Sequence, residues 1–177
     1  MEEKFREIKK EYNNLQRDML KQGKLPLRDT GVGFWGGAIA EEIFEAFKRI
    51  KLHNFKSFID LGSGDGRVVL IASLFGVKAI GIEVDNELFI KSLGVQRKLN
   101  MPNAIFYNND FFEHSFSGYD ILFCNPDQPI EKDLEKKLIN EMTGKLILYG
   151  HHFHPKNLNM EDSFIINGTL VTVYGKE

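Results

Sequence analysis

A run of closely spaced glycines between a short apolar segment and a helix constrains this chain more than any other feature. Residues 57–60 have the composition of a buried strand, and Gly62, Gly64 and Gly66 follow before helical periodicity resumes. Glycines at a strand-to-helix turn let the backbone approach a bound molecule closely, and the start of the helix offers unpaired N–H groups. The turn therefore predicts a ligand site within an α/β fold.

From residue 56 onward, segments of strand length alternate with helical patterns. We expect strands at 56–60, 78–84, 104–108, 119–124 and 145–150, and helices at 66–75, 86–99 and 130–142. This alternation implies parallel strands joined by right-handed crossovers. Near the C-terminus, Asn167-Gly168 separates two further strand-like runs, which is typical of a tight antiparallel hairpin. We therefore expect a mostly parallel sheet with an antiparallel hairpin at its end.

Two amphipathic helices are predicted ahead of the first strand, at 2–22 and 38–51, with a glycine-rich segment at 30–37 between them. The first helix carries one narrow apolar stripe, formed by Phe5, Ile8, Tyr12, Leu15 and Met19. We favour packing of this stripe on the main domain over a dimer seam or an arm that grips a substrate.

The composition narrows the classes of protein to consider. The 177 residues suffice for one domain and are too few for two ordinary ones, and the net charge of −2 gives no global basic field for nucleic acid. The single cysteine, Cys124, leaves no internal disulfide framework and fits a reducing compartment. The first residues are charged, and the longest apolar run, 68–72, is too short to cross a bilayer. We expect a cytoplasmic protein without a membrane segment.

The spacing of the glycines distinguishes between candidate ligands. A dinucleotide site needs G-x-G-x-x-G so that a pyrophosphate can lie on the helix end, whereas this turn reads G-x-G-x-G, with Arg67 in the place of the third dinucleotide glycine. Asp60 and Asp65 also lie in the turn. Carboxylates disfavour a pyrophosphate but suit a ligand that carries an ammonium group and a sulfonium. These features argue against a nicotinamide dinucleotide.

Two further markers follow the turn at the ends of the next strands. Glu83 ends the second strand, about twenty residues past the turn, where an acid can accept hydrogen bonds from both ribose hydroxyls. Asp110 follows the third strand, where an acceptor can bind an adenine amino group with Phe111 as apolar cover. Each marker alone is weak, but their order and spacing together favour a nucleotide-containing cofactor.

Taken in order, Asp60-x-Gly-x-Gly-x-Gly66, Glu83, Asp110 and Asn125-Pro126 resemble the successive motifs of the class I S-adenosylmethionine-dependent methyltransferases. The resemblance covers about residues 37–175. It implies a Rossmann-like sheet of seven strands in the order 3-2-1-4-5-7-6, with strand 7 antiparallel and helices at the N-terminus. We therefore expect a single methyltransferase domain over 1–177, with the N-terminal helix and glycine-rich segment at 1–36 and the Rossmann-like core at 37–177.

The same resemblance implies roles for the motif residues. The turn would contact the methionine part of the cofactor, Glu83 the ribose, and Asp110 the adenine. The predicted cofactor-binding residues are therefore Asp60, Gly62, Ser63, Gly64, Asp65, Gly66, Glu83, Asp110 and Phe111.

The loop after the fourth strand, 125–129, faces the methyl acceptor, because ligands bind at the carboxyl ends of the strands in open α/β sheets. Methyltransferases of exocyclic base amines commonly carry Asn/Asp-Pro-Pro-aromatic here, and this chain departs from that pattern at Asp127 and Gln128. The helix at 134–142 and the strand after it are more similar to small archaeal protein lysine methyltransferases and mitochondrial ATP-synthase c-subunit lysine methyltransferases. A Tyr-x-Pro-Thr stretch typical of that subgroup is replaced here by Phe34-Trp-Gly-Gly37.

We therefore expect an enzyme that transfers a methyl group to an amine nitrogen, foremost that of a protein lysine. Two alternatives remain open: methylation of an RNA or DNA base, and a non-catalytic protein that binds S-adenosylmethionine. The candidate catalytic residues are Asn125, Asp127 and Tyr149, and the candidate substrate-binding residues are Phe34, Trp35 and Pro126. Core packing of Phe34 and Trp35, and a turn or helix N-cap at Asp127, are the structural alternatives.

The histidines near the end of the fifth strand do not predict a metal site. His151 and His152 are adjacent and point apart in an extended chain, so that only His152 and His154 share a face. Two ligands do not complete a zinc site. A role at the substrate mouth or in proton transfer remains open for these side chains.

Overall fold

A seven-stranded sheet runs through the centre of the molecule. The computed structural model describes residues 1–31, 33–130 and 132–176. The strands lie in the order β5-β4-β3-β6-β7-β9-β8. Their bounds are β3 (Ser57–Leu61), β4 (Lys78–Glu83), β5 (Ala104–Asn108), β6 (Ile121–Cys124), β7 (Lys145–Tyr149), β8 (Asn159–Ile166) and β9 (Thr169–Gly175). Numbered along the chain, this is the order 3-2-1-4-5-7-6, so the predicted Rossmann-like fold class is confirmed.

The pairing within this sheet is parallel from β5 to β7 and antiparallel beyond β7. The predicted hairpin at Asn167-Gly168 joins β8 to β9, and both of its turn residues have positive φ, 50° and 96°. β8 begins at Asn159, earlier than the pattern predicts. A register shift between Met160 and Asp162 interrupts the alternation of side chains, so the sequence pattern does not reveal this part of the strand.

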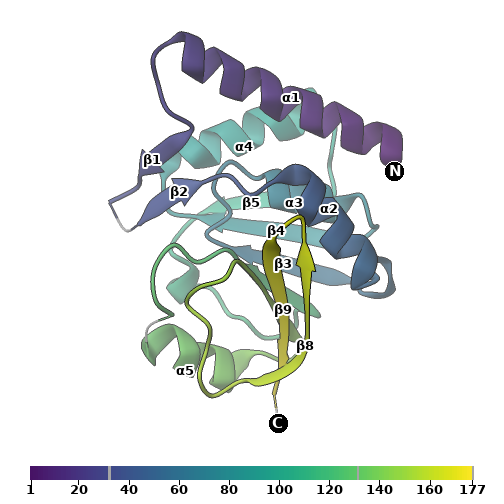
Figure 1. The fold of residues 1–177 in the computed structure, drawn as a ribbon, viewed down its shortest axis with the longest axis vertical. Coiled ribbons are helices and arrows are strands. Elements are labelled where there is room, and N and C mark those ends of the chain that lie inside the picture. Colours follow the sequence, from purple (N-terminus) through teal and green to yellow (C-terminus); the bar gives the residue numbers. More distant parts are fainter. Residues whose placement is uncertain (32, 131, 177) are drawn as a thin grey trace.

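Helices cover both faces of the sheet (Figure 1). They are α1 (Glu2–Lys21), α2 (Ala40–Arg49), α3 (Arg67–Ser73), α4 (Asn86–Lys98) and α5 (Lys132–Glu141), with short 3-10 turns η1 (Leu52–Asn54) and η2 (Phe111–Glu113). Helices α1 to α4 share one hydrophobic cluster with the sheet, whereas α5 packs in a second cluster on the other face. Residues 32, 131 and 177, which fall within the predicted segments 30–37, 130–142 and 1–177, lie outside the described residues.

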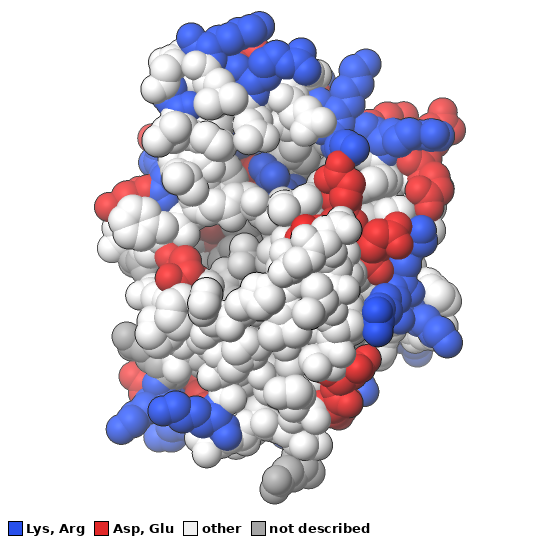
Figure 2. Space-filling model, viewed as in Figure 1, with Lys and Arg blue, Asp and Glu red and all other residues white. Residues whose placement is uncertain are grey.

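The apolar stripe of α1 packs on the main body of the chain, as predicted. Phe5, Ile8 and Tyr12 are buried, and the Phe5 ring stacks on Phe44 of α2 at 4.0 Å between centroids. Ion pairs tie the edges of the helix down, for example Lys98 Nζ to Glu11 at 2.7 Å. Lys and Arg side chains gather along the edge of the molecule that α1 forms (Figure 2).

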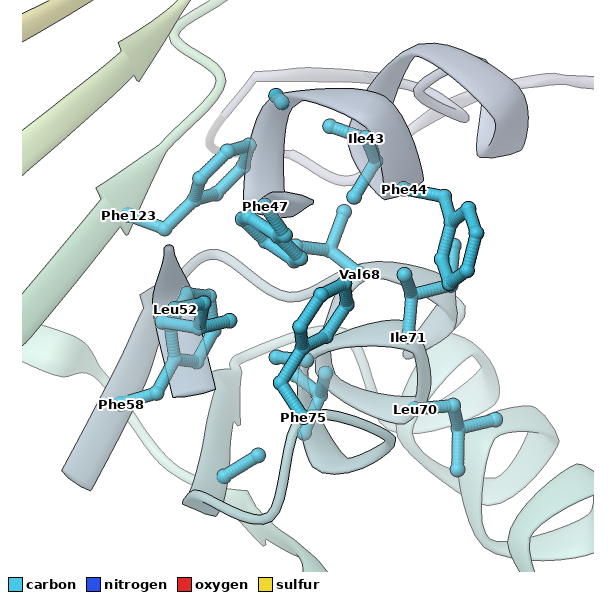
Figure 3. Packing of buried hydrophobic residues seen from close by; sticks show 14 of the residues in the cluster. Ile43, Phe44, Phe47, Leu52, Phe58, Val68, Leu70, Ile71, Phe75 and Phe123 are labelled. Carbon is cyan, nitrogen blue, oxygen red and sulfur yellow. The ribbon is translucent and has the colours of Figure 1, made fainter. Parts of the chain in front are cut away.

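Phenylalanines fill the space between α2, α3 and the sheet (Figure 3). Phe47 is fully buried and meets the rings of Phe58, Phe75 and Phe123 edge-on, at 5.4–6.0 Å between centroids. Edge-to-face pairs of this kind stabilise a core beyond the burial of their area. This cluster holds β3 and β6 beneath the helices and so fixes the two strands whose ends carry the glycine turn and Asn125.

A small antiparallel hairpin, β1 (Leu27–Asp29) and β2 (Phe34–Gly36), is the main element that the sequence pattern did not predict. It crosses the carboxyl-end edge of the central sheet between α1 and α2. Among the described residues, no helix combines the length and the apolar character needed to cross a membrane.

Candidate active site

A cavity of about 540 Å³ opens at the carboxyl ends of β3, β4 and β6. Figure 2 shows the molecule hollowed at this level, with acidic atoms at the opening and inside it. Twelve of the predicted site residues line it: Phe34, Trp35, Asp60, Gly62, Ser63, Asp65, Glu83, Asp110, Phe111, Asn125, Pro126 and Asp127. The structure thus brings the predicted cofactor and acceptor residues to one cavity, although Gly64, Gly66 and Tyr149 are not on its wall.

The glycine turn between β3 and α3 has a backbone conformation that residues with a side chain rarely adopt. Gly62, Gly64 and Gly66 have φ of 79°, 56° and 82°. The N–H groups of Gly62 and Ser63 both donate to the carbonyl of Ile82, at 3.0 and 2.9 Å, which pins the turn to β4. The left-handed region favours glycine because it has no Cβ to clash. The spacing of the three glycines therefore follows from the shape of the turn.

The two glycines outside the cavity wall have packing roles. A Cβ on Gly66 would meet Ser92 and Phe106, so this residue allows α3 to approach α4 and β5. A Cβ on Gly64 would overlap the indole of Trp35. The Trp35 ring therefore lies directly on the glycine turn, and Lys91 Nζ lies 5.3 Å from its centroid.

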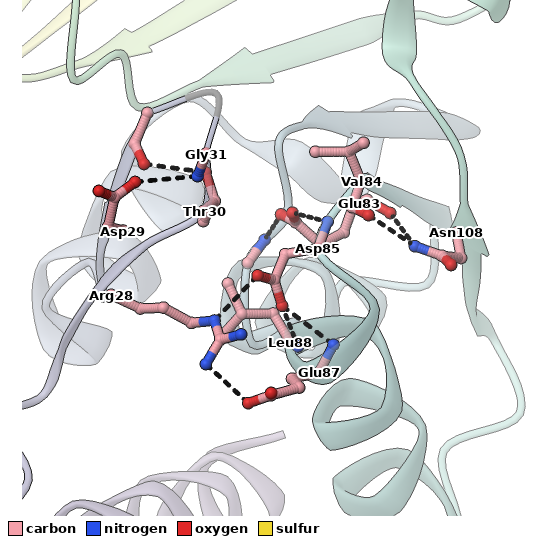
Figure 4. A network of polar contacts seen from close by, with 12 residues as sticks. Arg28, Asp29, Thr30, Gly31, Glu83, Val84, Asp85, Glu87, Leu88 and Asn108 are labelled. Atoms are coloured by element: carbon pink, nitrogen blue, oxygen red, sulfur yellow. Dashed lines mark hydrogen bonds and ion pairs between the residues drawn. The ribbon is translucent and has the colours of Figure 1, made fainter.

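Glu83 connects the end of β4 to the glycine turn (Figure 4). Its Oε2 accepts a hydrogen bond from the Gly64 N–H at 2.7 Å, and its Oε1 accepts one from the Asp85 N–H at 2.8 Å. Burial raises the pKa of the Glu83 carboxyl, and these two hydrogen bonds oppose that rise. Because each carboxylate oxygen has a second lone pair, Glu83 keeps acceptor capacity for a ligand in the cavity.

The β1–β2 hairpin is tied to the same region by Arg28. Its Nε donates to Asp85 Oδ2 at 2.8 Å, and its Nη1 donates to Glu87 Oε2 at 2.6 Å (Figure 4). Asp85 also caps α4 by accepting from the N–H groups of Glu87 and Leu88. The hairpin, the end of β4 and the start of α4 therefore share one polar network.

The acids of the turn lie in different environments. Asp60 is buried, and burial together with the charges of Glu83 and Asp65 raises the pKa of its carboxyl well above 3.8. Asp65 is also buried, but Arg67 forms a fork with its two oxygens, with Nη2 to Oδ2 at 2.7 Å. A bound cation would therefore stabilise the ionised form of Asp60 more than that of Asp65, which is already paired with Arg67.

Asp110 and Phe111 lie at the end of β5, where the adenine contact was predicted. The Asp110 side chain accepts from the Phe112 N–H at 2.8 Å and so starts η2. The rings of Phe111 and Phe112 lie 4.8 Å apart, and both residues line the cavity. Phe112 is a wall residue that the sequence argument missed, although it adjoins the predicted pair.

On the acceptor side, Asp127 contacts the hairpin. Its Oδ2 accepts a hydrogen bond from the Phe34 backbone N–H, and a Cβ on Gly33 would overlap this carboxylate. Phe34 is 68% exposed, so it is not a core residue. Asp127 therefore links the loop after β6 to the hairpin across the cavity, a contact that neither a simple turn nor a helix cap describes.

Tyr149 lies away from this cavity. Its hydroxyl donates to Glu42 Oε2 of α2 at 2.5 Å, and burial together with that hydrogen bond raises its pKa to about 12. The Cys124 thiol does line the cavity, and burial followed by the charges of Asp60 and Asp127 raises its pKa to about 12. Both side chains therefore stay protonated near neutral pH.

Two histidines of the loop after β7, His151 and His154, contact the β8–β9 hairpin. His151 Nε2 lies 2.6 Å from the Gly168 carbonyl oxygen, and His154 Nδ1 lies 2.7 Å from the Tyr174 hydroxyl. Neither histidine, nor His152, lines the cavity. Within the described part of the chain, no three His, Cys, Asp or Glu residues are grouped to hold a metal ion.

The residues of the cavity fit S-adenosylmethionine. Carboxylates face the space beside the glycine turn, and Glu83 lies where a ribose would be expected, with Phe111 and Phe112 beyond it. A volume of about 540 Å³ is that of a small-molecule site. These carboxylates and aromatic rings match an ammonium group, a sugar with two hydroxyls and a flat base.

The family model that matches this chain is the ANTKMT methyltransferase domain, over residues 60–162, which is more than half of the chain. This chain belongs to that family. The match begins at Asp60 of the glycine turn and ends in β8, so it includes the ends of β4, β5 and β6 that build the cavity. The family assignment and the site geometry agree.

Curated relatives of this ANTKMT-family chain are named as lysine methyltransferases. It is 35% identical over 89 residues to the ATP synthase c-subunit lysine N-methyltransferase from Homo sapiens, a match that covers 49% of this chain and 37% of that protein. The corresponding protein from Xenopus laevis is 34% identical over 87 residues, covering 48% and 38%. The matched region thus spans well under half the length of these relatives.

Solved structures share the fold. An RNA methyltransferase from Salinibacter ruber in complex with S-adenosyl-L-homocysteine has a TM-score of 0.70 at 19% identity, covering 80% of this chain and 94% of its own. A Pyrococcus abyssi tRNA (uracil-54, C5)-methyltransferase has a TM-score of 0.66 at 14% identity, covering 80% and 45%. At these identities the likeness confirms the methyltransferase fold alone.

Proposed function

We propose that this chain transfers a methyl group from S-adenosylmethionine to the side-chain nitrogen of a protein lysine. The observation that carries the proposal is the charge of the cavity wall. Of its described residues, five are carboxylates and one is a cation; the carboxylates are Asp60, Asp65, Glu83, Asp110 and Asp127. The cation, Arg67, is already paired with Asp65. Such a wall attracts a cationic donor and a cationic acceptor, and it repels a phosphate backbone.

The donor half of the site would hold the cofactor along the turn. We assign the methionine ammonium to the region of Asp60, the ribose hydroxyls to Glu83, and the adenine to Asp110 with Phe111. S-adenosylmethionine supplies a methyl group already activated on a sulfonium. The protein has then mainly to align donor and acceptor, and alignment alone can lower a barrier by up to about 7–11 kcal/mol.

The acceptor half must bring in a lysine without its proton. Apolar walls such as Phe34 and Pro126 lower the pKa of a lysine that enters between them, because burial disfavours the charged form. Oxygens of Asn125 and Asp127 accept hydrogen bonds from the free amine and direct its lone pair. Tyr149 has no part in this proposal because its hydroxyl is bound to Glu42.

The curated relatives support a lysine acceptor, since both are named as lysine N-methyltransferases of the ATP synthase c-subunit. We extend to this chain the chemical class of that acceptor, a lysine in a protein. A cytoplasmic location stays a prediction from the single cysteine.

The test is transfer of a labelled methyl group from S-adenosylmethionine into a native lysate, followed by digestion with protease or nuclease. We expect label that protease releases and that amino-acid analysis finds in methylated lysine. Label released by nuclease would overturn the proposal in favour of base methylation. Cofactor binding without label in any macromolecule or small molecule would favour a non-catalytic binding protein.

A further inference from the structure

The N-terminal helix reaches the glycine turn through one buried side chain. The Tyr12 hydroxyl of α1 donates a hydrogen bond to the Asp65 carbonyl oxygen at 2.7 Å. Tyr12 is 3% exposed, and the two residues are 53 positions apart in the chain. Asp65 lines the cavity, so the contact joins α1 directly to the donor side of the site.

The Tyr12 ring also packs against Arg67, whose side chain binds the Asp65 carboxylate of the turn. The Arg67 guanidinium lies over this ring, 4.8 Å from its centroid. The same guanidinium forms the fork to the Asp65 carboxylate, and its Nη1 donates to the Ala38 carbonyl oxygen at 3.0 Å. Two residues far from the turn in sequence are therefore bound to it: Tyr12 contacts the Asp65 carbonyl, and Ala38 contacts Arg67.

The backbone at this point has a conformation that needs support. Asp65 lies between Gly64 and Gly66, whose φ angles are 56° and 82°. Glycines leave a chain free to adopt many other conformations, so contacts outside the turn must select this one. The Tyr12 hydroxyl fixes the one backbone carbonyl between the two glycines.

We propose that Tyr12 is a positioning residue for the donor site, which holds the glycine turn in the shape that accepts the cofactor. This inference rests on the proposed function. It assigns α1, which lies outside the span of the family match, to the cofactor site rather than to the molecular surface alone. Burial raises the pKa of the Tyr12 hydroxyl well above 10.0, followed by the charge of Asp65, so the hydroxyl stays a donor.

The test replaces one hydroxyl and keeps the ring. Tyr12→Phe retains the packing on Arg67 and removes only the hydrogen bond to Asp65. Tyr174→Phe is the matched control, because Tyr174 is 2% exposed, its hydroxyl lies 2.7 Å from His154, and it does not line the cavity. Calorimetry with S-adenosylhomocysteine gives the Kd, thermal unfolding gives the stability, and methyl transfer gives KM and kcat.

We expect Tyr12→Phe to raise the Kd, and the KM for S-adenosylmethionine, by about three- to tenfold, the effect of one net hydrogen bond. The value of kcat at saturating cofactor should stay within roughly twofold, because saturation restores the binding-competent turn. Tyr174→Phe should lower the midpoint of thermal unfolding without changing the Kd.

The outcomes separate this inference from the function on which it rests. If the unchanged chain binds no S-adenosylhomocysteine, the proposed function fails. If the unchanged chain binds it and Tyr12→Phe binds equally well, Tyr12 is only a core residue and the inference fails alone. A fall in kcat at saturation with no change in KM would also overturn the positioning role.

Discussion

The Glu83 carboxylate accepts a hydrogen bond from the backbone N–H of Gly64 at 2.7 Å, and this contact joins the end of β4 to the turn after β3. The second oxygen of Glu83 holds the N–H of Asp85. A single acid therefore shapes both loops that border the donor half of the cavity.

Replacing this acid should affect cofactor affinity strongly. We expect Glu83→Ala to weaken S-adenosylmethionine binding by about 1.5–3 kcal/mol, the range for hydrogen bonds to a charged group. The affinity of Glu83→Gln should lie between those of the unchanged chain and Glu83→Ala, because the amide keeps one acceptor oxygen. Calorimetry measures the effect, with Glu3→Ala on the exposed start of α1 as the control. Equal affinities for the unchanged chain and Glu83→Ala would show that Glu83 is not the ribose ligand.

The buried acids predict that stability and affinity respond to pH in opposite directions. The pKa values of Asp60 and Glu83 are raised above 3.8 and 4.5, mainly by burial. Above the ordinary values of 3.8 and 4.5, the folded chain therefore still binds protons that the unfolded chain has lost. The free energy of unfolding falls as pH rises from those values through the raised pKa values of the folded chain. A cationic cofactor needs the ionised carboxylates, so its affinity should rise over the same pH window.

Urea unfolding and calorimetry over a series of pH values test this prediction, with Asp60→Asn as the comparison. The substitution should weaken both dependences, since it removes one of the two titrating carboxyls and leaves Glu83. Acids with lowered pKa contribute with the opposite sign and at lower pH. Asp120, held by backbone N–H groups, loses its stabilising contribution only as pH falls below its ordinary value of 3.8. Affinity that decreases with rising pH would contradict the assignment of Asp60 to a cationic group.

Gly64 is expected to tolerate no side chain. Gly64→Ala would place a Cβ inside the Trp35 indole and force alanine into the left-handed region. Gly76→Ala is a matched control, because its φ is 84° but no atom lies within 4 Å of the added Cβ. We expect Gly76→Ala to cost about 1–2 kcal/mol of stability and to leave cofactor affinity unchanged.

Gly64→Ala should cost more stability than this control and abolish measurable binding. Chemical denaturation and calorimetry on both variants give the comparison. Equal behaviour of the two alanine variants would mean that Trp35 moves aside freely and does not constrain the turn.

Asp127 is expected to affect turnover more than cofactor binding. Asp127→Ala removes a polar group from the acceptor side and releases Phe34 of the hairpin. Since misplacement by about 1 Å can cost a hundredfold, we expect kcat to fall about ten- to a hundredfold. The Kd for S-adenosylhomocysteine should change little. Steady-state kinetics with an unmethylated acceptor protein check this, and unchanged kcat would leave Asp127 with only a structural role.

The central sheet and the glycine turn could be predicted because their signals are local. Apolar strands, turn glycines and Asn167-Gly168 each encode a conformation within a few residues. Parallel strands then bring their carboxyl ends to one edge, which is why Glu83, Asp110 and Asn125 meet at a single cavity.

The hairpin and the position of Tyr149 could not be predicted in this way. Strands β1 and β2 are held at the cavity by contacts of Arg28 with Asp85 and Glu87, which are distant in sequence. Tyr149 does end β7, but side chains alternate across a strand, and its hydroxyl faces Glu42 of α2 rather than the cavity. Which face a strand-end residue takes depends on register, and a single-residue difference reverses it.

Trp35 gives the molecule an optical property that follows from its position. It is the single tryptophan of the chain, and its indole rests on Gly64 at the edge of the proposed donor site. Its fluorescence therefore originates from one place, and any change in the polarity or quenching of that place will alter the emission. The chain thus carries its own spectroscopic sensor of events at the turn, without an attached dye.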